Sequence, residues 1–346
     1  MVKTVCIVSL SRGIIGEKRV RHELEIGVRR LKEYGLNVTF GAHALSGLDY
    51  LDAHPEARAA DLLAAFSDPE VDLILCAIGG NDTYRLAPYL FTNDALKKAL
   101  SGKLFLGFSD TTINHFMLHK LGLNTFYGQA FLSDICEIGK TMLPYTEHFF
   151  HELLETGTIR EIRPSDVWYR ERTSFRPDQI GTPLPPLPNR GFVLLQGAPV
   201  FSGPILGGCV DSIGEMLDEA LDHTNAHTMT VVCKEFGLFP SKEDWKGRIL
   251  LLETSEVQPE PETYRKELQA IKKQGVFDVV SGVLVGKPMN ERYYDEYSSI
   301  LKEVIDNPML PVVYNVSIGH ALPRCIVPFG VPATVNVTEQ RITFSE

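Results

Sequence analysis

A serine at residue 109 stands where a sequence of this kind could place a nucleophile. In the stretch LFLGFSDTTINHFMLHKLG (104–122), an apolar run typical of a buried strand ends at Gly-Phe-Ser-Asp, and apolar residues then recur at helical spacing. A sharp turn from strand to helix lifts one side chain clear of the sheet, and the N–H groups that open the helix point towards the atom it attacks. This position favours Ser109 as a nucleophile; the alternative is that it only caps the helix.

A serine nucleophile needs a base that takes its proton and a carboxylate that orients the base. His320 is the candidate base among ten histidines, because in PVVYNVSIGHALPRCIVPFG it follows a buried strand and a glycine. A purely structural histidine is the alternative. Glu253 is the candidate carboxylate, since it ends the apolar run RILLLE and a buried acid requires a hydrogen-bonding partner. The acids of the next loop, which contains prolines, are expected to be solvated: Glu256, Glu260 and Glu262.

A glycine pair could supply hydrogen-bond donors to such a site. Gly79 and Gly80 follow the buried strand of DLILCAIGGNDTYRLAPYL, where backbone can approach a ligand closely and N–H groups can bind an oxyanion. The competing interpretation is a phosphate-binding turn for a dinucleotide. The GxGxxG pattern is absent here, and RGIIG after the first strand is only a weak match.

Metal chemistry is not indicated. His115 and His119 stand at positions i and i+4 of the helix after Ser109, which is the spacing of two zinc ligands on one helical face. The glutamate of an HExxH motif and a third ligand are both missing, so a polar helix face is the better interpretation. We therefore expect no metal and no cofactor.

The order of elements predicts where these residues meet. The first 125 residues alternate strand and helix patterns with nearly all-apolar strands, which predicts an α/β fold with a parallel sheet covered on both faces. Ligands bind outside the carboxyl ends of such strands. Gly79, Gly80 and Ser109 all fall at carboxyl ends, so one crevice could contain them.

Two domains are predicted, with boundaries at 1–160 and 191–346. The segment 161–190 between them holds the proline-rich stretch RPDQIGTPLPPLPNRG and is interpreted as a connecting loop or lid. Its aromatic residue Trp168 either packs under this loop or contacts substrate. Strands of the second domain are predicted in GFVLLQG, GRILLLETS, FDVVSGVLVG, LPVVYNV and TVNVTEQRITF.

Composition excludes several classes of partner. The 346 residues are 44% hydrophobic and 23% charged with a net charge of −10, and no basic cluster is present, which argues against nucleic acid or an anionic membrane. No signal peptide is recognised at the N-terminus, and no apolar run reaches the roughly 18 residues that cross a bilayer. The six cysteines lack CxxC spacing and are expected to be buried free thiols in a reducing cytoplasm.

Together these stretches resemble the LD-carboxypeptidase family of serine peptidases, and in particular its branch of microcin C self-immunity peptidases. The resemblance is carried, in the family's order, by HPEARAADLLAAFSDPEVDLILCAIGGNDTYRLAPYL, GFSDTT, GGC, LLLETSE and IGHALPRCIVPFG. It implies a Rossmann-like N-terminal domain with the nucleophile and a smaller β-rich C-terminal domain.

The resemblance also implies roles for individual residues. It makes Ser109, His320 and Glu253 a catalytic triad. It makes the N–H of Asp110 and those of the glycine turn, Gly79 or Gly80, the donors to the oxyanion.

The substrate implied by the resemblance depends on the branch. Housekeeping members remove the terminal D-residue of murein tetrapeptide, whereas self-immunity members cleave the amide between a peptide-derived aspartate and a modified nucleotide. GGND, where housekeeping members usually have GGYG, together with ETSE and the tryptophan loop, resembles the second type. Asn81 and Trp168 are then substrate contacts, with a nucleobase stacked on Trp168. A second tryptophan of the family is replaced here, with Phe175 nearby.

We therefore expect a serine peptidase that acts on a small peptidyl or aminoacyl nucleotide. Murein tetrapeptide is the alternative substrate, and a non-catalytic ligand-binding Rossmann protein is the alternative from a different class. The family further implies a homodimer.

Overall fold

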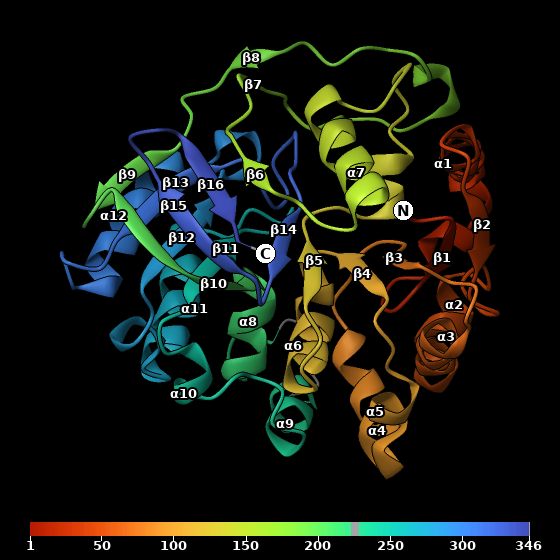
Figure 1. Ribbon diagram of the computed structural model, residues 1–346, viewed down its shortest axis with the longest axis horizontal. Helices are drawn as coiled ribbons and strands as arrows, with labels where there is room; N and C mark the ends of the chain where they lie inside the picture. The colour runs from red at the N-terminus through yellow and green to blue at the C-terminus, as the bar shows by residue number, and fades with distance from the viewer. Residues whose placement is uncertain (223–227, 346) are drawn as a thin grey trace. The chain divides into compact units, whose positions relative to one another are not determined.

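The computed structural model describes residues 1–222 and 228–345, which divide into two compact units. Unit 1 comprises residues 1–158 and 172–184, and unit 2 comprises residues 159–171 and 185–346. The predicted connecting segment 161–190 is thus shared between the two units. Figure 1 follows the chain through the elements of both.

Unit 1 is built on a parallel sheet with the strand order β5-β4-β3-β1-β2. These strands are β1 (Thr4–Val8), β2 (Asn37–Phe40), β3 (Leu73–Cys76), β4 (Leu104–Gly107) and β5 (Thr125–Tyr127). The helices of the unit are α1 (Arg21–Glu33), α2 (Leu48–Ala53), α3 (Pro55–Ser67), α4 (Ala87–Phe91), α5 (Ala95–Ala99), α6 (Thr112–Lys120) and α7 (Pro144–Thr156).

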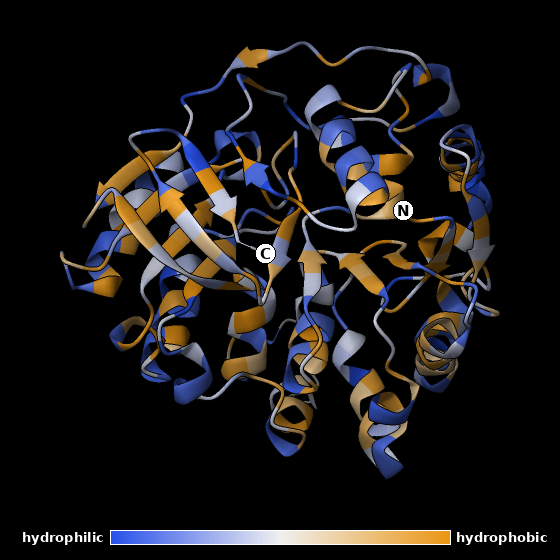
Figure 2. Cartoon of the chain, viewed as in Figure 1, coloured by the Kyte–Doolittle hydropathy of each residue, from blue (hydrophilic) through white to orange (hydrophobic). Residues whose placement is uncertain are grey.

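The parallel register brings the ends of the central strands of unit 1 to one edge. Ile7 pairs with Leu75, Leu75 with Leu106, and Leu106 with Phe126. Strands β1 and β3 are buried along their whole length, and Figure 2 shows the central strands coloured mostly as hydrophobic while α7 mixes both kinds of residue. Burial on both faces is the reason for these continuous apolar runs. The predicted α/β class and its parallel sheet are confirmed.

Unit 2 contains a mixed sheet with the order β6-β16-β15-β10-β11-β12-β13-β9, in which β10 to β13 run parallel. Its strands are β6 (Glu161–Ile162), β9 (Val193–Gln196), β10 (Val200–Cys209), β11 (Ile249–Glu253), β12 (Gly282–Gly286), β13 (Val312–Val316), β15 (Pro332–Asn336) and β16 (Arg341–Phe344). Strands β7 (Val167–Trp168) and β8 (Leu187–Pro188) form a separate antiparallel pair, and β14 spans Val327–Phe329.

Helices of unit 2 and one long strand were not predicted. The helices are α8 (Val210–Leu217), α9 (Thr228–Glu235), α10 (Lys242–Trp245), α11 (Pro261–Lys273) and α12 (Tyr294–Ile305). Strand β10 contains one proline and several glycines, which disguise a strand in sequence. At Gly207 (φ 147°), an added Cβ would lie 1.9 Å from the carbonyl oxygen of Leu251, so close contact with β11 requires this glycine.

Two further expectations concern the cysteines and membranes. All six cysteines lie within the described residues and are buried free thiols, as predicted. Among residues 1–222 and 228–345, no helix combines the length and the apolar character that crossing a membrane demands.

Candidate active site

Ser109 occupies a strained turn between β4 and α6 in unit 1. A short 3-10 turn (Ser109–Thr111) leads into the helix, and Ser109 has a φ of 65°, a left-handed conformation that costs a non-glycine residue on the order of 1–3 kcal/mol. Its N–H donates to the hydroxyl of Tyr127 (3.1 Å), and its carbonyl accepts from Oγ1 of Thr112 (2.7 Å). Tertiary contacts therefore hold the strained backbone in place.

The helix that follows Ser109 is capped at other positions. Within the described residues, Phe108 is the N-cap of the 3-10 turn and Thr111 that of α6, and no side-chain capping bond is present at either. The N-cap positions of both elements are thus taken by residues other than Ser109.

The glycine turn after β3 lies directly against this serine. A Cβ added at Gly79 would stand 2.7 Å from Oγ of Ser109 and 3.2 Å from the backbone nitrogen of Asp110. Gly80 is placed against Ser11, whose Oγ would lie 2.2 Å from an added Cβ. Unit 1 thus brings the predicted nucleophile together with the predicted oxyanion donors, and only glycine permits so close an approach.

In unit 2, Glu253 and His320 form a buried pair. Glu253 is the last residue of β11 and is 1% exposed, and its Oε2 lies 2.7 Å from Nδ1 of His320. A carboxylate accepts, so Nδ1 carries the proton and Nε2 is left to face a reacting group. The backbone N–H of His320 donates to the same oxygen (3.2 Å). The predicted partner of the strand-end acid is therefore the predicted base.

The turn that carries the histidine is shaped by a glycine and an arginine. Gly319 has a φ of 86°, and an added Cβ there would lie 2.4 Å from Oε2 of Glu253. Arg324, 3% exposed, donates from Nη2 to the carbonyl of His320 (3.1 Å) and from Nε to that of Gly319. Arg324 was not predicted as a site residue, because its contact with the turn is visible only in three dimensions.

Glu256 is exposed, as predicted, but it also pairs with the candidate base. Its Oε2 lies 3.1 Å from Nε2 of His320, although the side chain is 60% exposed. Burial lowers the pKa of His320, but the opposing effects of Glu253 and Glu256 are larger and raise it to about 10. In this conformation both ring nitrogens face a carboxylate, which favours the protonated imidazole.

His115 corrects a second expectation. The prediction of a polar helix face is wrong for this residue, which is completely buried. Its Nδ1 lies 2.7 Å from Oγ1 of Thr125 and its Nε2 lies 3.1 Å from the carbonyl of Gly107, while burial lowers its pKa to about 3. It is a neutral structural residue. Within residues 1–222 and 228–345, no group of three or more His, Cys, Asp or Glu side chains could hold a metal ion.

The two predicted substrate contacts differ in accessibility. Asn81 is exposed directly after the glycine turn. Trp168 is only 5% exposed, and Nζ of Lys287 lies 4.8 Å from the centre of its ring. In this conformation Trp168 is a packed aromatic, and a base could stack on it only after the ring is uncovered.

Titration of His320 tests the electrostatics of unit 2. Because Glu256 stabilises the imidazolium, Glu256→Gln should lower the pKa of His320 by on the order of one pH unit. Glu253→Gln should lower it further, since Glu253 contributes more. The measurement is an NMR titration of the His320 ring. Glu260→Gln removes a carboxylate of the same loop that pairs with Arg292 instead, and serves as the control. An unchanged pKa in Glu256→Gln would contradict the paired geometry.

Comparison with known proteins identifies the family. The model of the LD-carboxypeptidase N-terminal domain matches residues 5–128, and that of the LD-carboxypeptidase C-terminal domain matches residues 202–335. The crystal structure of an MccF-like protein from Streptococcus pneumoniae in complex with AMP is 56% identical with a TM-score of 0.97, covering 100% of this chain and 99% of that one.

Two curated relatives are more distant. The microcin C7 self-immunity protein MccF of Escherichia coli is 24% identical, covering 92% of this chain and 87% of its own. A Bacillus subtilis protein named "Probable murein peptide carboxypeptidase" is 25% identical, covering 92% and 85%. With both family domains matched in order along the chain, this protein belongs to the LD-carboxypeptidase family and is a serine-type peptidase.

Proposed function

We propose that this enzyme hydrolyses an amide bond in a peptidyl or aminoacyl nucleotide of the microcin C type, with Ser109, His320 and Glu253 as its catalytic triad. The observation that carries the catalytic part is the buried pair of Glu253 and His320, which leaves Nε2 as the nitrogen that takes the proton. The strained backbone of Ser109 beside Gly79 supports its role as nucleophile.

Hydrolysis would proceed through an acyl-enzyme. Oγ of Ser109 attacks the carbonyl carbon as Nε2 of His320 takes its proton, and the oxyanion accepts from the N–H groups of Asp110 and of Gly79 or Gly80. The imidazolium then gives the proton to the leaving nitrogen, and the amide bond breaks. Water, deprotonated by His320, attacks the ester, which releases the acid and restores the serine.

Glu256 has to leave Nε2 before this chemistry begins. Its side chain is 60% exposed, so a rotation into solvent costs little burial. With the carboxylate withdrawn, the pKa of His320 falls towards the range in which a histidine can act as a base. Substrate that displaces Glu256 would therefore activate the base as it binds.

The nucleotide part of the proposal is supported by the 56% identical relative, whose crystal structure contains AMP. The exposed Asn81 after the glycine turn is a proposed substrate contact. Stacking of the base on Trp168 requires that the ring first separate from Lys287. Murein tetrapeptide remains the second candidate substrate, favoured by the similarity to the Bacillus subtilis relative. Membership in a peptidase family sets aside the non-catalytic binding protein.

Ser109→Ala should lower kcat by roughly 10³-fold or more, as is usual for triad members, while the protein stays folded. The assay is hydrolysis of an aspartyl nucleotide amide. Ser67→Ala, which removes an exposed hydroxyl at the end of α3, is the matched control and should keep full activity. Full activity of the Ser109 variant would refute the proposed mechanism.

Side-by-side assays should show faster hydrolysis of the aspartyl nucleotide amide than of murein tetrapeptide. Loss of base stacking in Trp168→Ala should weaken nucleotide binding by about 5- to 150-fold, the equivalent of about 1–3 kcal/mol. Because Trp168 is buried, Trp168→Phe serves as a second variant that keeps an aromatic ring. Faster cleavage of murein tetrapeptide, with neither rate changed by Trp168→Ala, would favour the second candidate.

We also propose that the enzyme is a cytoplasmic homodimer. The buried free thiols fit a reducing compartment, and a twofold pair is the commonest assembly of such chains. Sedimentation velocity at micromolar concentration should give twice the mass of the chain. A single species of monomer mass across that range would exclude the dimer.

A further inference from the structure

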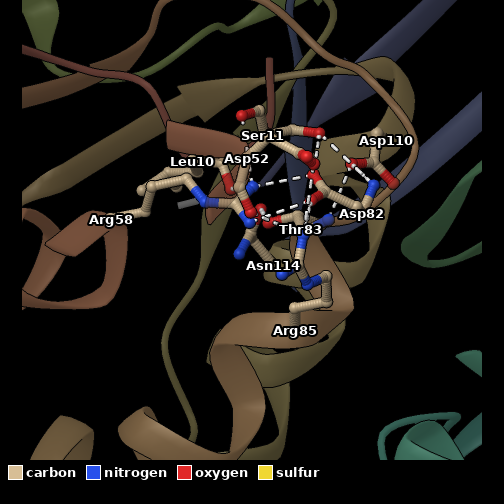
Figure 3. A network of polar contacts seen from close by, with 9 residues as sticks. All are labelled: Leu10, Ser11, Asp52, Arg58, Asp82, Thr83, Arg85, Asp110 and Asn114. Atoms are coloured by element: carbon tan, nitrogen blue, oxygen red, sulfur yellow. Dashed lines mark hydrogen bonds and ion pairs between the residues drawn. The ribbon is translucent and has the colours of Figure 1, made fainter. Parts of the chain in front are cut away.

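Arg58, in helix α3 of unit 1, is fully buried although it carries a charge. Figure 3 shows its guanidinium against Asp82: Nη1 donates to Oδ1 (2.7 Å) and Nη2 to Oδ2 (2.9 Å). Nη1 also donates to the carbonyls of Leu10 (3.3 Å) and Ser11 (3.1 Å), in the segment that follows β1. A buried arginine is tolerated only with such partners, so α3, the segment that follows β1 and Asp82 are joined by one group.

Asp82 in turn is bound to the residue after the nucleophile. Its backbone N–H and that of Thr83 each donate to Oδ2 of Asp110 at 3.0 Å (Figure 3). Thr83 also donates from Oγ1 to Oδ1 of Asn114 (2.8 Å), one turn along α6. The segment that follows the glycine turn is thereby attached to the start of the helix that follows Ser109.

These bonds hold both ends of the glycine turn. On one side the turn lies against Ser109, and on the other the N–H of Arg12 donates to the carbonyl of Gly79 (3.2 Å) while Gly80 packs on Ser11. The direction of the turn's N–H groups relative to the serine is therefore set by contacts outside the turn. Donors to an oxyanion act through such preorganised geometry, and a displacement of about 1 Å can cost on the order of 10²-fold in rate.

We propose that Arg58 is a positioning residue for hydrolysis: by clamping Asp82, it fixes the segment from Gly79 to Thr83 against Asp110 and so aims the oxyanion donors. This inference rests on the proposed function. The second arginine on Asp82 contributes less to the clamp, because Arg85 is 33% exposed and donates to Oδ2 only (3.0 Å). Arg58 itself touches no reacting atom.

The test compares Arg58→Met with wild type in hydrolysis of the aspartyl nucleotide amide. An oxyanion interaction strengthens in the transition state, so kcat should fall roughly 10- to 100-fold while KM stays within about twofold. The rate at which a fluorophosphonate labels Ser109 should fall in parallel, because that adduct also places an oxygen at the donors. Arg58→Lys keeps the charge without the two-pronged contact and should give an intermediate kcat.

Arg30→Met is the matched control. Arg30 is also a buried arginine of unit 1, but it donates to the carbonyls of Ile135 and Gly139, far along the chain from the glycine turn. With rates corrected for the folded fraction, measured by circular dichroism, Arg30→Met should keep the wild-type kcat.

Two results would overturn the proposal. One is a wild-type kcat in folded Arg58→Met or Arg58→Lys, and the other is an equal loss in Arg30→Met. Ser109→Ala separates this failure from that of the proposed function: if it remains active, the catalytic mechanism itself is wrong, whereas an inactive Ser109→Ala beside a fully active Arg58→Met refutes only the positioning role.

Discussion

Two charge pairs hold the segments of the candidate active site in place, and each charge can be buried only because it has a partner. In unit 1 the partner pair is Arg58 and Asp82, and in unit 2 it is Glu253 and His320. Breaking such a pair leaves an uncompensated charge away from water, a penalty of several kcal/mol. Each pair therefore fixes the backbone at its two ends. Arg58 lies in α3 and Asp82 follows the turn after β3, whereas Glu253 ends β11 and His320 follows β13.

Close approach of backbone is the second shared feature. Gly79 lets the turn after β3 pass beside Ser109, and Gly319 lets the turn after β13 pass beside Glu253. In each case a methyl group in place of hydrogen would collide with the reactive side chain or its partner. At both positions the missing Cβ leaves room for close approach of the neighbouring segment.

In unit 2 both ring nitrogens of His320 are paired with carboxylates, whereas a general base needs one nitrogen free to take a proton. Glu253 is buried, whereas Glu256 is mostly exposed and has room to rotate into solvent. Removing one negative charge from the ring lowers its proton affinity. An exposed acid thus lies on the nitrogen that the proposed mechanism assigns to proton transfer.

Sequence by itself determined the strand and helix alternation of unit 1, because apolar runs and helical spacing follow directly from burial on a sheet. It also singled out Ser109, Glu253 and His320, since each ends or follows a buried strand. The resemblance paired Glu253 with His320, 67 positions away, and the structure shows the contact. Only the tertiary structure decided that Arg58 meets Asp82, 24 positions away, because no local pattern encodes such a contact.

The same limit explains the misjudged residues. Glu256 is exposed as predicted, but its pairing with His320 was not foreseen, and His115 was predicted on a polar helix face although the fold buries it. Strand β10 was not predicted because glycine is unfavourable in strands. Its Gly207 is nevertheless required, since it permits the close contact with β11. Hydrophobic periodicity predicts which side chains of an element face water. It does not predict which side chains contact each other, because those contacts depend on how segments distant in sequence pack in the folded chain.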